Sequence, residues 1–112
     1  MQLSHYVQGN FTVVCINEAR MDAAVAPAFK QAMTQLVNEG VNRIILDLSQ
    51  VQFMDSSGLG VLVTLLKMVG SRGDLIIAGV RGIVADLFKL TRMDRVFRLV
   101  ANVDAVAEAT AA

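Results

Sequence analysis

The sequence is poor in the residues that build disulfides and metal centres. Cys15 is its only cysteine, His5 is its only histidine, and tryptophan is absent. A single cysteine cannot form an internal disulfide, which fits a reducing compartment, and no Cys/His cluster indicates a metal site. Cys15 lies in the apolar run 11–16, where a free cysteine behaves as a small hydrophobic residue. We therefore expect neither a metal nor a cofactor.

Net charge and long apolar runs are also missing. Ten basic side chains balance ten acidic ones over the 112 residues, so no overall field would recruit nucleic acid or an anionic membrane. No apolar stretch approaches the roughly 20 residues that span a bilayer. The first residues lack the basic region and apolar core of a signal peptide. We expect a soluble, cytoplasmic protein, and the balanced surface gives no reason to expect anything but a monomer.

Basic residues nevertheless gather in the second half of the chain. A solvated face is the plainer interpretation of this bias, and a patch for phosphate or a partner is the alternative. The residues concerned are Arg72, Arg81, Lys89, Arg92, Arg95 and Arg98.

The length and the high apolar fraction fit a single domain over residues 1–112. Residues 3–8 alternate weakly between apolar and polar, Gly9-Asn10 suits a turn, and Phe11–Ile16 is a β-branched run of strand length. This order predicts an N-terminal hairpin. Nearly continuous apolar runs at 43–48 and 75–78 predict strands buried on both faces, and 96–100 a last short strand.

Between these strands the apolar residues take a helical spacing. The first predicted helix has Pro27 in its first turn and ends at Gly40. The second runs from about Ser57 to Val69, the third is short, and the Ala-rich tail 105–112 predicts a final helix that frays. The stripes expected to face the core are Phe29, Met33, Leu36 and Val37, then Leu59, Leu62, Val63 and Leu66, then Ile83, Leu87 and Leu90.

Alternation of strands and helices from Phe11 onward predicts parallel strands joined by right-handed crossovers. The fold class is α/β. We expect a small, mostly parallel sheet with an N-terminal hairpin strand, covered by about four helices.

The most informative segment is Phe53-Met54-Asp55-Ser56-Ser57-Gly58-Leu59-Gly60-Val61, which joins a strand to the second helix. In parallel sheets the carboxyl ends of the strands carry ligand and partner sites. Asp55 and Ser56 are both good N-cap residues. Gly58 and Gly60 leave the start of the helix without bulk, so a protein or a nucleotide phosphate has room to approach.

Taken alone, this segment has several interpretations. It fits an ordinary helix cap. A serine nucleophile lacks a partner, because His5 is the only histidine and no Gly-x-Ser-x-Gly elbow is present,. A nucleotide site lacks a Gly-rich loop with its lysine. We therefore do not expect an enzyme.

The segment from Phe53 to Val63 resembles the core motif of STAS domains, specifically the bacterial anti-sigma factor antagonists. The similarity extends over the whole domain. It includes Met21-Asp22 with Ala26-Pro27, then Lys67-Met68-Val69 before a Gly turn, then Leu87-Phe88 with Leu90-Thr91. Ala19 departs from the pattern, since the family often has Gly there.

The resemblance implies a switch. It makes Ser56 the phosphoacceptor, with Ser57 as the alternative, and it implies an anti-sigma factor partner that is also a serine kinase of the GHKL type. The unmodified antagonist captures this kinase, phosphorylation ends the capture, and a metal-dependent serine phosphatase restores it. The rival interpretation is an interaction or ligand-binding STAS module of another signalling or transporter assembly.

Around Ser56 we expect a partner surface built from the loop and its neighbours. Asp55 either caps the helix or contacts the kinase, and Asp22 is either a turn residue or a docking residue on the adjacent loop. Apolar side chains, including Met68, would add an adaptable contact. The predicted contact residues are Asp22, Met54, Asp55, Ser56, Ser57, Gly58, Leu59 and Gly60.

Overall fold

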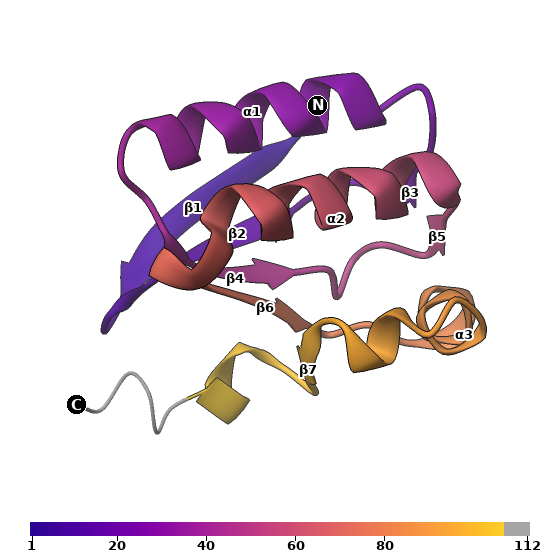
Figure 1. Ribbon diagram of the computed structural model, residues 1–112. Coiled ribbons are helices and arrows are strands. Elements are labelled where there is room, and N and C mark those ends of the chain that lie inside the picture. Colours follow the sequence, from indigo (N-terminus) through magenta and orange to yellow (C-terminus); the bar gives the residue numbers. More distant parts are fainter. Residues whose placement is uncertain (107–112) are drawn as a thin grey trace.

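The computed structural model describes residues 1–106, which form a five-stranded sheet, a separate strand pair and three α-helices (Figure 1). The five-stranded sheet has the order β1-β2-β4-β6-β7, and β3 pairs with β5. The strands are β1 Leu3–Gln8, β2 Phe11–Ile16, β3 Arg20–Met21, β4 Arg43–Asp47, β5 Phe53–Met54, β6 Asp74–Ala78 and β7 Arg98–Val100. The helices are α1 Ala26–Asn38, α2 Ser56–Val69 and α3 Gly82–Leu90.

The α/β prediction is confirmed. β1 and β2 form the expected antiparallel hairpin around Gly9, and the pairs β2-β4, β4-β6 and β6-β7 are parallel. Of the four predicted helices, the described residues contain three. Val103–Val106 forms a 3₁₀ turn, and the rest of the predicted tail helix, positions 107–112, lies outside the described residues.

Helices α1 and α2 lie side by side over one face of the sheet (Figure 1). As predicted, α1 carries Pro27 in its first turn and is followed by Gly40 at φ +99°. The stripe predicted for α2 is only partly correct. Val63 and Leu66 are half-buried, and the buried face also takes in Val61, Leu65 and Val69. Because α2 contacts both the sheet and α1, its buried face is broader than a single stripe.

The stripe predicted for α3 is wrong for two of its three residues, because only Leu87 packs, half-buried, against the core. Ile83 is 61% exposed and Leu90 83% exposed, while Val84 and Phe88 are buried. Phe88 meets Phe97 edge to face, with ring centroids 6.0 Å apart. The helix therefore packs mainly through the neighbouring i, i+4 pair and turns Ile83 and Leu90 outward.

The other sheet face has its own core, formed by Phe11, Val13, Ile45, Ile76, Ala78 and Val106. Cys15 lies half-buried beside it, and burial raises the pKa of its thiol. The thiol is therefore protonated at neutral pH and behaves as the predicted small hydrophobic residue. Within residues 1–106, no helix is both long and apolar enough to cross a membrane.

Candidate functional site

The short strands β3 and β5 bring together two loops that are distant in the sequence. They pair in parallel, with Met21 opposite Met54. Asp22 and Asp55 follow these residues directly, and the Asp55 amide donates to the Met21 carbonyl at 3.4 Å. The prediction that Asp22 lies on a loop at the same end of the sheet as Asp55 is therefore confirmed.

Asp55 is the N-cap of α2. Its backbone is extended, and its Oδ1 accepts hydrogen bonds from the amides of Ser57 at 2.9 Å and Gly58 at 3.4 Å. These amides are among the donors that have no partner within the helix. The carboxylate also places negative charge at the positive end of the helix dipole. The capping interpretation of Asp55 is confirmed.

The two serines after Asp55 have different surroundings. Ser56, the first residue of α2, is exposed. Ser57 is half-buried and lines an open groove of about 400 Å³ between α2 and the start of α1, together with Ala23, Ala26, Pro27, Lys30 and Val61. An enzyme that approaches from solvent therefore reaches the Ser56 hydroxyl more directly than that of Ser57.

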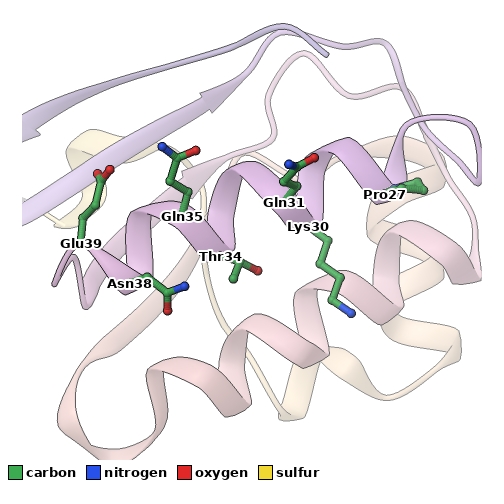
Figure 2. A pocket seen from close by; sticks show the side chains of 7 residues that line it. All are labelled: Pro27, Lys30, Gln31, Thr34, Gln35, Asn38 and Glu39. Carbon is green, nitrogen blue, oxygen red and sulfur yellow. The ribbon is translucent and has the colours of Figure 1, made fainter.

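Lys30 brings a positive charge to this groove. Figure 2 shows Lys30 extending from α1 toward α2, beside a second open groove of about 570 Å³ on the outer face of α1. Most of the residues that line this second groove have polar side chains, although their carbon atoms supply most of its surface: Pro27, Lys30, Gln31, Thr34, Gln35, Asn38 and Glu39. No residue pattern indicates Lys30, because its position beside Ser57 depends on how α1 packs against α2.

Asp22 is held by its own network. Its Oδ2 accepts from Arg20 Nε at 3.2 Å, and its Oδ1 accepts from the Ala24 amide at 3.1 Å. The hydrogen bond from Arg20 is the main reason that the pKa of Asp22 lies below its usual value. The Arg20 guanidinium also lies 4.2 Å above the Phe53 ring,. Asp22 thus remains an anion near Asp55, and Arg20 is a site residue that sequence patterns did not indicate.

Three predicted contact residues belong to the core instead. Met54 is 2% exposed, and Leu59 and Gly58 are also buried. A Cβ at Gly58 would lie 2.5 Å from the Met21 carbonyl oxygen, so this glycine lets α2 approach β3 and gives no access to a partner. Of the predicted set, Ser56 and Gly60 are exposed, and Asp22, Asp55, Ser57 and Met68 are half-buried.

The site offers little for catalysis. His5 lines a pocket against the later turns of α1, whereas Ser57, the neighbour of Ser56, lines a groove at the first turn of that helix. His5 and Ser56 are therefore near opposite ends of α1. Within residues 1–106 no group of three His, Cys, Asp or Glu side chains is placed to hold a metal ion. The accessible features are a hydroxyl at a helix N-terminus and two neighbouring carboxylates, which suit modification and recognition by another protein.

Comparison with known proteins identifies the family to which the chain belongs. The family model of the STAS domain matches residues 2–106, so the chain belongs to the STAS family. Within that family it belongs to the anti-sigma factor antagonists, which are regulatory proteins and not enzymes.

Individual relatives agree with this placement. The anti-sigma-B factor antagonist of Staphylococcus aureus (strain NCTC 8325 / PS 47) is 32% identical over 72 residues, 63% of this chain and 67% of that protein. An anti-sigma factor antagonist from Mycobacterium paratuberculosis has a similar structure, with a TM-score of 0.87 and 25% identity over 99% of this chain and 94% of that one. The Bacillus cell fate determinant SpoIIAA in its phosphorylated form shares the fold, with a TM-score of 0.71 and 18% identity over 96% and 97% of the two chains.

Proposed function

We propose that this protein is a phosphorylation-controlled anti-sigma factor antagonist, with Ser56 as the phosphoacceptor. The observation that carries the proposal is the exposed hydroxyl of Ser56 at the N-terminus of α2, directly after the Asp55 cap. Ser57, the alternative acceptor, faces the groove beside α1. The protein acts as a single-domain monomer in the cytoplasm.

The partner in this proposal is an anti-sigma factor that is also a serine kinase of the GHKL type. The unmodified antagonist binds it and releases a sigma factor. The kinase then phosphorylates Ser56, which ends the binding, and a metal-dependent serine phosphatase resets the cycle. Support comes from the antagonist family to which the chain belongs and from the name of its S. aureus relative.

Phosphorylation at this position is compatible with the fold. A phosphoserine adds nearly two negative charges, and a helix N-terminus stabilises an anion by about 0.3–1 kcal/mol. Ser56 is exposed, so the phosphate displaces no core side chain. The backbone should therefore change little.

The same phosphate opposes binding of the partner. It adds bulk and charge beside the carboxylates of Asp22 and Asp55, and a docked partner would have to desolvate all three groups. A loss of about 2.8 kcal/mol in binding weakens affinity by about a hundredfold, which suffices for a switch. The mechanism is local exclusion and does not require refolding.

The test is to incubate the chain with candidate GHKL kinases and ATP and to locate the phosphate by mass spectrometry. Ser57→Ala should be phosphorylated at position 56, and Ser56→Ala should not be phosphorylated. In binding assays with the same kinase, Ser56→Ala should bind like the native protein and Ser56→Asp about a hundredfold more weakly. Equal binding of Ser56→Asp and native protein would contradict the switch. Phosphate found only on Ser57 would move the acceptor by one residue.

A further inference from the structure

Helix α3 presents an apolar stripe to solvent. Ile83, Leu87 and Leu90 follow each other at helical spacing, and Leu90, at 83% exposure, is the most exposed large apolar side chain within residues 1–106. Val84 and Phe88 hold α3 in place from the buried side, with half-buried Leu87 at their border, so Ile83 and Leu90 are not needed for packing. Apolar groups gathered on one accessible helix face are typical of a protein contact.

Basic side chains surround the C-terminal end of this stripe. Residues 81–98 contain five basic and two acidic residues, although the whole chain is neutral. Within the described part of the chain, Lys89, Arg92 and Arg95 make no ion pair. Arg92 has φ +62°, which makes it the one non-glycine residue of this part in the left-handed region. Such a conformation is disfavoured for arginine and recurs at functional turns.

The stripe lies at the same end of the molecule as Ser56. Helix α3 contacts β5, and β5 leads through Asp55 directly into Ser56. Figure 1 shows α3 beside β5, at the end of the molecule where α2 begins. A partner that reaches Ser56 therefore comes close to α3 as well.

We infer that the α3 stripe, Ile83, Leu87 and Leu90, is a second contact surface for the anti-sigma factor kinase that acts on Ser56. The surface that fits it is apolar and flanked by acidic side chains, because its own border is basic. This inference rests on the proposed function and adds the chemistry of the partner. A second copy of this chain would place its own basic border against this one, and the like charges would repel each other. A membrane is a poor partner, because α3 has only nine residues and its opposite side packs into the core, so that three side chains at most could enter the lipid,.

The experiment measures the affinity of the kinase that phosphorylates Ser56 for exposed-residue variants of the full chain. Ile83→Gln and Leu90→Gln should each weaken binding about tenfold, in the manner of central apolar contacts. The matched control is Val7→Gln, because Val7 is 75% exposed on β1 at the opposite edge of the sheet. This control should bind like the native protein.

The basic border is tested through the association rate. Lys89→Gln with Arg95→Gln should slow association several-fold at low salt and leave less effect at high salt. The charge-matched control is Lys67→Gln with Arg72→Gln, two exposed residues at the far end of α2, and it should have a smaller effect. Equal slowing by both pairs would overturn the assignment of charge to the α3 border.

Amide spectra of the ¹⁵N-labelled chain with the kinase separate this inference from the proposed function. Shifts at positions 55–60 and at 83–92 support both. Shifts at 55–60 alone, with native affinity of Leu90→Gln, overturn the α3 surface and leave the Ser56 switch standing. Shifts at neither segment overturn both. Dimerisation through the stripe, or binding of phosphatidylglycerol vesicles that Leu90→Gln abolishes, would assign the stripe to another occupant and overturn the inference.

Discussion

Gly58 and Gly60 lie two positions apart in the first turns of α2 and have different roles. Gly58 faces β3, where a Cβ would meet the Met21 carbonyl oxygen at 2.5 Å. Gly60 is exposed, and a Cβ there would meet nothing within 4 Å. The first glycine is thus required for packing, whereas the second costs helix stability and leaves open surface beside Ser56.

Alanine substitution should separate these roles. Gly58→Ala should lower the free energy of unfolding by about 1–3 kcal/mol, since the added methyl group forces α2 away from β3. Gly60→Ala should raise it by about 0.5–1 kcal/mol, because alanine loses less backbone entropy in a helix. Urea unfolding monitored by circular dichroism measures both. Destabilisation by Gly60→Ala would show that its surroundings are less open than described.

The Arg20–Asp22 pair makes a prediction about pH. The hydrogen bond from Arg20 lowers the pKa of Asp22 below its ordinary value of 3.8. Asp22 therefore contributes stability that is present above about pH 4 and is lost as the pH falls through the lower pKa of the folded state. Arg20→Gln should raise the pKa of Asp22 toward 3.8, as followed by carboxyl carbon shifts. An unchanged pKa would assign the shift to the Ala24 amide, which also bonds to Asp22.

At the scale of elements, α3 shows what the sequence can and cannot predict. Its existence and approximate length follow from helical spacing. Its orientation does not, because the stripe Ile83, Leu87, Leu90 and the pair Val84, Phe88 are both apolar and adjacent on the helix. Phe97, which packs against Phe88, decides between them, and that contact depends on the tertiary fold.

The same distinction applies to the candidate site. The Asp55 cap is local, so a residue pattern predicts it. The burial of Met54 and the packing role of Gly58 depend on β3, which enters the site from more than thirty residues earlier in the chain. Strand pairs of two residues have no periodicity to detect, so residue patterns predict neither β3 nor β5, and the predicted contact surface includes residues that belong to the core.

Neighbouring residues of α3 should differ in their contribution to stability. Val84→Ala should cost about 2 kcal/mol, because it removes buried methyl groups and leaves a cavity. Ile83→Ala should change the free energy of unfolding by less than about 0.5 kcal/mol, as expected for an exposed position. Chemical denaturation of both variants checks this difference. A cost for Ile83→Ala equal to that of Val84→Ala would mean that the stripe is part of the core.

At the scale of the whole molecule, the sheet is covered unequally. Two helices, α1 and α2, cover one face. On the other face the C-terminal 3₁₀ turn contributes Val106, its buried residue, to the core, with Val103 half-buried beside it. Val106→Ser should therefore cost about 2 kcal/mol, through lost apolar burial and a buried hydroxyl. Val7→Ser is the exposed control and should be nearly neutral. Equal stability of the two variants would show that the second core does not need this turn.

The pairing of β3 with β5 has a consequence for what a modifying enzyme recognises. This two-residue ladder, together with the Asp55 cap, holds the backbone around Ser56, the proposed acceptor, in place before any encounter. An isolated peptide spanning residues 50–62 has neither constraint and would have to become ordered on the enzyme surface. We therefore expect such a peptide to be phosphorylated far more slowly than the intact domain at equal concentration, so that the enzyme reads a shape and not a linear consensus. Equal rates for peptide and domain in a radiolabel assay would refute this.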